Sequence, residues 1–418
     1  MTPSSVTKLG DPTQFALGAL DIYRNGWIQP ENQWLVKLWP PGFMVIEGLI
    51  LKMFGIDAPF IFILILLNSA LVALLLLVMR LNLLAVNKPP LAALLPLAPF
   101  LFPVTRLFLL EPSGIILGEG FSIAFFMTSM LLVPMAIRSR SLKCGALAGL
   151  TLAFAAYFRS QFDLIVTVLT SMAILFAVAY FLFFKARICG TDQQHMTRVI
   201  KTITIMLFVA HATMMPWRLH NQYEPSTGNT SWVQTQTLVF TNAGRTDKDL
   251  IEAGGAWIVQ GGGNVACKVE PSYCGKSEKA GFYQAFMNHP IDWFLYKYEA
   301  LPDYWFSSLR NFANIPHSAT AVDLINNLVI LFFVFFNLAL LLKIRRHPDF
   351  PVYAWQCFSF YVCSFCIFLF VHYETRYFYA LKIYGIFTFI SLSAIAWRLS
   401  RFSRAALPSE QAAWFRYA

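Results

Sequence analysis

One short stretch divides this chain into two kinds of sequence: Pro216-Trp217-Arg218-Leu219-His220-Asn221. An apolar run of roughly eighteen residues ends there, long enough to cross a membrane. No apolar segment of that length follows until about residue 321, where such segments resume. The pattern predicts that a polar domain, residues 218–320, leaves a helical membrane bundle at this point.

The composition agrees with a membrane bundle. Of the 418 residues, 57% are hydrophobic and 13% are charged, whereas soluble domains carry about 25% charged residues. The net charge is +10, which we assign to basic cytoplasmic loops and not to a nucleic-acid partner. The composition therefore predicts a polytopic membrane protein.

The apolar segments predict nine spanning helices, at residues 57–79, 90–108, 114–136, 144–158, 162–184, 199–217, 321–342, 352–371 and 379–397. A run at 43–54 is too short to span and contains Glu47 and Lys52, so we expect an interfacial helix there. The expected fold is an all-α polytopic bundle carrying one extracytoplasmic α+β lobe.

Basic residues orient the bundle, because they fill every alternate loop. They are Arg80, Lys88, Arg138, Arg140, Lys143, Lys185, Arg187, Arg198, Lys343, Arg345, Arg346, Arg398, Arg401 and Arg404. Such loops face the cytoplasm. The tail 398–418 is then inside, and the N-terminal segment 1–56 and domain 218–320 are outside the inner (cytoplasmic) membrane. The bundle comprises 57–217 and 321–397, and an outside N-terminus predicts a further spanning helix before Met1.

Three carboxylates on the outer side are candidates for proton transfer. Asp11 opens the N-terminal segment, where a helix-capping role is the alternative. Glu111 lies in a short outer loop and can equally be a solvated loop acid. Glu119 lies about a turn into the third predicted span, where a charge needs a partner or a function.

Three arginines on the same side are candidates for binding an anion. Arg159 interrupts a long apolar stretch and could instead snorkel to the surface. Arg218 lies at the end of its span. Arg376 forms a charged outer turn with His372 and Glu374, for which a structural ion pair is the alternative. Planar guanidinium groups suit a phosphate, and a nearby carboxylate can take a proton from a hydroxyl.

Other chemistry has weaker signals. The histidines lack zinc-ligand spacing, and no Gly-x-Ser-x-Gly nucleophile motif occurs. Cys267 and Cys274 both lie in the polar domain and could pair if that domain is outside the cytoplasm.

Several short motifs, in this order, resemble one enzyme superfamily. They are Asp11-x3-Phe15-Ala16, Gly26, Trp39-Pro40-Pro41-Gly42, Phe54-Gly55, Gly118-Glu119, Arg159, Pro216-Trp217-Arg218-x2-Asn221 and Glu374-x-Arg376-Tyr377. Their order and topology resemble GT-C glycosyltransferases, with the branch of protein O-mannosyltransferases and bacterial lipid A aminoarabinose transferases as the nearer match.

The resemblance implies transfer of a sugar from a polyprenyl-phosphate donor to a lipid, glycan or protein acceptor outside the cytoplasm. It implies catalytic roles for Asp11, as base, and Glu119, and donor phosphate binding by Arg159, Arg218 and Arg376. Supporting roles fall to Glu111, His372, Glu374 and Tyr377.

Alternatives remain open from the sequence. The first loop lacks the Asp-Glu pair of the mannosyltransferases, so a divalent metal stays an open question, and no other cofactor is expected. An O-antigen polymerase or ligase would use a diphosphate donor. A lipid or polysaccharide transporter would place polar residues along a path through the membrane, whereas here they gather at the outer face.

Overall fold

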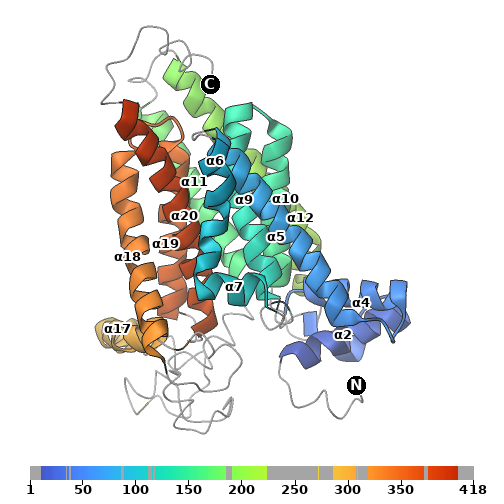
Figure 1. Ribbon diagram of the computed structural model, residues 1–418. Helices are drawn as coiled ribbons and strands as arrows, with labels where there is room; N and C mark the ends of the chain where they lie inside the picture. The colour runs from blue at the N-terminus through green and yellow to red at the C-terminus, as the bar shows by residue number, and fades with distance from the viewer. Residues whose placement is uncertain are drawn as a thin grey trace.

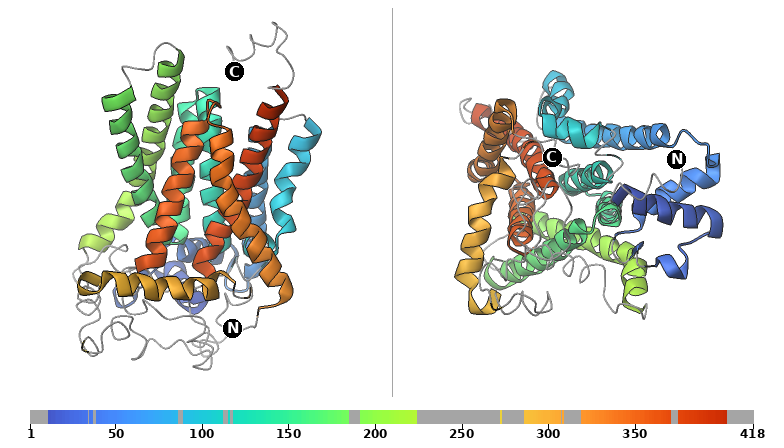
Figure 2. Two further views of the ribbon diagram at one scale, coloured as in Figure 1. Left: turned by 90° about the vertical axis from the view of Figure 1, so that its left-hand side faces the viewer. Right: turned by 90° about the horizontal axis from the view of Figure 1, so that it is seen from below.

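The computed structural model of the chain describes residues 11–33, 35–36, 39–85, 89–111, 115, 118–184, 191–223, 272, 286–306, 308, 319–370 and 375–402. These residues form helices with no strand among them. The helices run between two ends of one bundle, and helix α2 and the last turn of helix α20 lie at opposite ends (Figure 1 and Figure 2). Most of the expected α+β lobe falls outside the described residues.

Each predicted spanning segment overlaps helical residues in the described part of the chain. The bundle elements are α5 (Phe60–Leu84), α6 (Pro89–Leu94), η2 (Leu95–Leu101), α7 (Pro103–Leu109), α9 (Glu119–Ser139), α10 (Leu142–Phe158), α11 (Gln161–Ala179), η3 (Tyr180–Phe184), α12 (Thr191–Tyr223), α18 (Ala321–Lys343), α19 (Phe350–Phe370) and α20 (Thr375–Phe402). Six helices in the described part are long and apolar enough to cross a membrane, or seven if one bent pair counts as a span. The chain is a multi-pass membrane protein, although the expected count of nine is not confirmed.

The second predicted span, 90–108, is the bent pair. Its two helical parts, 92–101 and 103–109, meet at an angle of 91°. Pro96 and Pro99 lie in the first part, and Pro103 begins the second. Proline removes a backbone donor and clashes with the preceding turn, so it ends or kinks a helix. The prolines account for a break that an apolar-run reading misses.

Two helices form the centre of the bundle. In their apolar stretches, 89% of α9 and 83% of α20 are buried, against 33%, 22% and 28% for α5, α11 and α18. The helices at the periphery of the bundle expose Leu, Ile and Phe side chains along their lengths. Such an apolar outer surface suits contact with lipid.

Polar side chains join the helices inside this apolar core. Asn82 Nδ2 donates to the Leu131 carbonyl at 2.7 Å, and Gln356 Nε2 donates to the Met130 carbonyl at 3.0 Å. Gly149 allows close packing of α10 on α12, because a Cβ there would lie 2.2 Å from the Met206 carbonyl oxygen. Interhelical hydrogen bonds and small residues are the usual means of packing helices in lipid.

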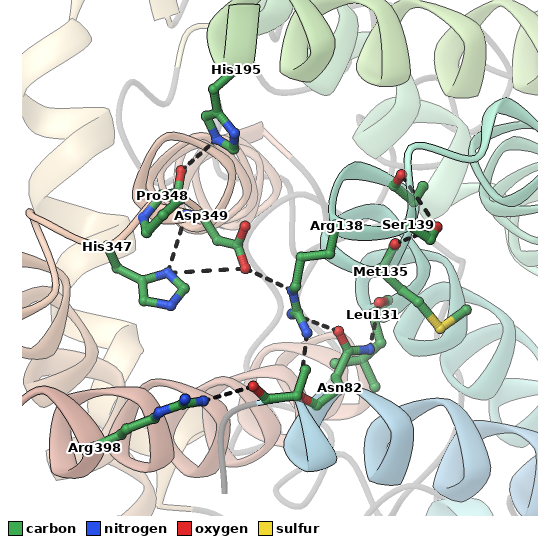
Figure 3. A network of polar contacts seen from close by, with 12 residues as sticks. Asn82, Leu131, Met135, Arg138, Ser139, His195, His347, Pro348, Asp349 and Arg398 are labelled. Atoms are coloured by element: carbon green, nitrogen blue, oxygen red, sulfur yellow. Dashed lines mark hydrogen bonds and ion pairs between the residues drawn. The ribbon is translucent and has the colours of Figure 1, made fainter. Parts of the chain in front are cut away.

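A larger polar network lies at the end of the bundle where helix α20 ends (Figure 3). Arg138 on α9 pairs with the buried Asp349 at 2.9 Å and donates to Asn82 Oδ1 at 2.8 Å. His195 on α12 contacts the Pro348 carbonyl at 2.8 Å. This network ties α5, α9 and α12 to the turn between α18 and α19.

Three helices lie at the opposite end, which the basic loops predict to be outside. They are α2 (Asp11–Asn25), α4 (Gly42–Phe54) and α17 (Pro290–Trp305). The helix α4 occupies the segment expected to be interfacial, and α17 lies across the bundle ends (Figure 2). Lys382 on α20 holds α17 there by donating to the Trp305 carbonyl at 2.9 Å. This end contains the candidate site.

Candidate functional site at one end of helices α9 to α12

Local backbone geometry brings the candidate side chains together. Gly118, with φ of +77°, turns the chain into α9, whose first residue is Glu119. The helix α10 stops at Phe158, and Arg159 is extended, so α11 starts at once in the opposite direction. This corner places Arg159 and the first turn of α11 at the same end of the bundle as Glu119.

Glu119 and Arg159 form a buried ion pair. Their side chains are 5% and 10% exposed. Arg159 therefore lies inside the protein and does not extend to the surface, the alternative considered above. A carboxylate on one helix and a guanidinium at the corner of another satisfy each other's charge in a region that solvates neither.

A second ion pair joins Arg218 on α12 to Asp163 in the first turn of α11. The Asp163 side chain is 3% exposed and that of Arg218 is 22% exposed. The sequence interpretation missed Asp163. The signal was present, since an acid at the start of an apolar helix needs a partner for the same reason as Glu119.

His211 extends this second pair into the bundle. Arg218 Nη1 lies 2.7 Å from His211 Nδ1, and His211 Nε2 lies 2.8 Å from Thr170 Oγ1. Arginine can only donate, so Nδ1 accepts and the proton of the neutral ring is on Nε2. Nε2 then donates to Thr170, whose hydroxyl donates to the Val166 carbonyl at 2.8 Å.

The N-terminal helices are packed against these pairs by an aromatic cluster. Phe43 on α4 contacts Phe15 on α2, with ring centroids 5.3 Å apart, and also Phe121 and Phe158, at 6.1 and 6.2 Å. Phe121 and Phe158 stand two residues after Glu119 and one before Arg159. Asp11 begins α2 about 6 Å along the helix axis from Phe15. The cluster therefore packs α2 and α4 beside the residues that flank the first ion pair.

Glu47 is an unexpected carboxyl in this region. The sequence placed it on an expected interfacial helix, and in the structure the residue is 4% exposed and packs within the protein. Its Oε2 atom has no hydrogen-bond partner among the described residues. Burial raises the pKa of the Glu47 carboxyl well above its usual range. Burial within α4 thus disfavours the charged form of this carboxyl group.

The other predicted site residues are less defined. Glu111 is exposed just after α7. Arg376 and Tyr377 lie in the first turn of α20, and their side chains are not described. His372, Glu374, Cys267 and Cys274 lie outside the described residues.

The two arginines differ in what they can still bind. A guanidinium has five N–H donors, and the contacts of Arg218 with Asp163 and His211 use two of its nitrogens. Arg218 is also twice as exposed as Arg159, at 22% against 10%. Arg218 is thus the better placed of these two arginines to meet an external anion.

Among the described residues, no group of three His, Cys, Asp or Glu side chains is arranged to hold a metal ion.

Comparison with known proteins gives one remote likeness. No family model and no curated protein matches the chain. Among solved structures, it is similar to the archaeal oligosaccharyltransferase AglB from Archaeoglobus fulgidus in complex with an inhibitory peptide and a dolichol-phosphate, at 12% identity and a TM-score of 0.43. The match covers 96% of this chain and 48% of that one, so this chain spans about half the length of AglB. A likeness this low says nothing about activity.

Proposed function

We propose that the protein is a membrane glycosyltransferase that moves a sugar from a polyprenyl-phosphate donor to an acceptor on the outer side of the cytoplasmic membrane. The observation that carries the proposal is the gathering of Glu119, Arg159, Asp163 and Arg218 at one end of four adjacent helices. Charged groups at membrane depth are costly, and they commonly mark a functional site.

The chemistry needs an anion site and a base at this surface. The acceptor hydroxyl oxygen attacks the anomeric carbon of the sugar, and the bond from that carbon to the phosphate oxygen breaks. The hydroxyl proton passes to a carboxylate, and the polyprenyl phosphate departs with one further negative charge. A guanidinium near that oxygen stabilises the charge, more strongly where water is scarce.

The contacts rank the candidates for these roles. Arg218 binds the donor phosphate, because it keeps donors and partial exposure while Asp163 and His211 hold it in place. Arg159 is more buried, and its ion pair with Glu119 stabilises the turn between α10 and α11. Asp11 is the proposed base, since Glu119 is committed to Arg159. A second phosphate contact by Arg376 is proposed from its position in the motif order alone.

Transfer assays in proteoliposomes test the proposal. Purified protein is supplied with a polyprenyl-monophosphate sugar or with the corresponding diphosphate, and we expect transfer from the monophosphate. Arg218→Ala and Asp11→Asn should each lower the rate about 100-fold or more. Arg346→Ala, an exposed arginine at the other end of the bundle, is the matched control and should transfer normally.

Two results would contradict this assignment. Use of the diphosphate alone would favour a polymerase or ligase. Normal rates in both Arg218→Ala and Asp11→Asn would remove the site from the reaction. Membrane abundance and a circular dichroism melt of each variant separate loss of chemistry from loss of folding.

A further inference from the structure

A groove runs between α11 and α12 and ends at His211, which contacts Arg218 of the second ion pair. Its volume is about 280 Å³. Its lining comes from both helices and includes Ala173, Ala177, Ile203 and Leu207, with Thr170 and His211 at one end. The groove is open on one side, since the lining residues Ile174 and Phe208 are 58% and 71% exposed.

The groove has a direction relative to the membrane. His211 precedes Arg218 by seven residues and follows the lining residue Ile200 by eleven, so the groove extends roughly 16 Å along α12 away from the ion pair. Arg218 and Asp163 lie at the outer end of these helices. The polar end of the groove is thus near the outer surface, and the apolar part reaches toward the middle of the bundle.

His211 belongs to both the groove and the ion pair. Its ring lines the groove, while its Nδ1 atom accepts from Arg218 and its Nε2 atom donates to Thr170. The polar atoms of Thr170 and His211 are therefore satisfied within the protein. A hydrocarbon chain beside them leaves no buried polar group without a partner.

We propose that this groove binds the prenyl chain of the lipid donor, with the donor phosphate at Arg218 where the groove ends. The assignment rests on the proposed function, which supplies a lipid phosphate as the substrate. A cation beyond the polar end of the groove and an apolar lining along the rest of it match a lipid that has an anionic head and a long apolar chain. One molecule lying along α11 and α12 can occupy the groove and reach Arg218, because His211 lies between the groove and Arg218.

Filling the groove tests the proposal. In Ala173→Trp and Ala177→Trp the indole takes the place of the chain, so the KM for a long-chain donor should rise at least tenfold with little change in kcat. A donor with only two prenyl units should show the same KM in both variants as in the unmodified protein. Leu175→Trp is the matched control, because Leu175 also lies on α11, is 62% exposed and does not line the groove.

A binding measurement makes the test independent of turnover. A polyprenyl phosphate with a diazirine at mid-chain is photolysed with the full-length protein in liposomes, and the labelled peptides are identified. We expect labels on α11 and α12 and their loss in Ala173→Trp. Ala173→Leu provides a smaller block if the tryptophan variants fold poorly.

The possible outcomes separate this proposal from the proposed function. Sugar transfer with an unchanged KM in the groove variants, and labels on other helices, would overturn the groove assignment alone. Labels on α11 and α12 in a protein that transfers no sugar from any donor would overturn the glycosyltransferase assignment and leave a lipid-phosphate site.

Discussion

Arg218 on α12 donates to Asp163 on α11, between residues that stand 55 positions apart in the sequence. The pair neutralises a cation that the sequence alone presents as available for an anion. In the proposed reaction, the donor phosphate shares Arg218 with Asp163. This suits a site that binds the phosphate more strongly as negative charge builds up during transfer.

Removing the carboxylate tests how far the pair supports the fold. Asp163→Ala leaves the guanidinium without its counter-charge, and breaking a buried pair in this way costs about 3 kcal/mol of unfolding free energy. Adding Arg218→Ala should restore part of that loss, because the unpaired charge is removed. Denaturant titration in detergent measures all four corners of the cycle. Strictly additive losses would show that the two side chains do not interact.

His211 should affect the rate of transfer by positioning Arg218. His211→Asn keeps an oxygen that can accept from Nη1, whereas His211→Leu removes the acceptor. A hydrogen bond to a charged group contributes about 1.5 kcal/mol, so we expect His211→Leu to lower kcat about tenfold and His211→Asn to recover most of it. Equal kcat values in the two variants would exclude the positioning role.

His347 predicts a loss of stability in acid. Burial, with help from the nearby arginines Arg138 and Arg398, lowers the pKa of His347 despite the opposing effect of Asp349. Its Nδ1 accepts from the Asp349 backbone N–H at 3.1 Å, which requires that this nitrogen carry no proton. The unfolded state then binds more protons, so stability falls as pH drops below about 6.5.

The measurement is the melting temperature in detergent between pH 8 and pH 5. We expect His347→Asn to reduce the fall in melting temperature below about pH 6.5, while His195→Asn provides a control, because His195 lies in the same network (Figure 3). An unchanged slope in His347→Asn would assign the acid sensitivity to another group.

Glu47 predicts the opposite dependence of folding stability on pH. The folded-state pKa of its carboxyl is raised, so the folded protein holds a proton that the unfolded chain loses above about pH 4.3. Stability therefore falls as pH rises from that value to the folded pKa. Glu47→Gln cannot ionise, so its melting temperature relative to the unmodified protein should increase over this range. A difference that stays constant with pH would mean that Glu47 is ionised in the fold.

The sequence alone determined the helices. A run of apolar residues in lipid must satisfy its backbone hydrogen bonds internally, so it forms a helix wherever it lies. For example, the segment predicted at 199–217 lies within α12, Thr191–Tyr223, and the one at 321–342 lies within α18, Ala321–Lys343. The sequence also indicated Glu119, Arg159 and Arg218 as candidate site residues, because a charged side chain in or next to an apolar membrane segment is energetically costly.

Only the tertiary structure decided which charges meet. Asp163 on α11 joins Arg218 on α12, and Glu119 joins Arg159, although in each case other acids lie within the same outer region of the sequence. Burial of Glu47 and the bend at Pro103 were likewise invisible in the hydropathy pattern. Hydropathy is a property of one segment at a time, whereas ion pairs and burial depend on how helices rotate and pack against each other.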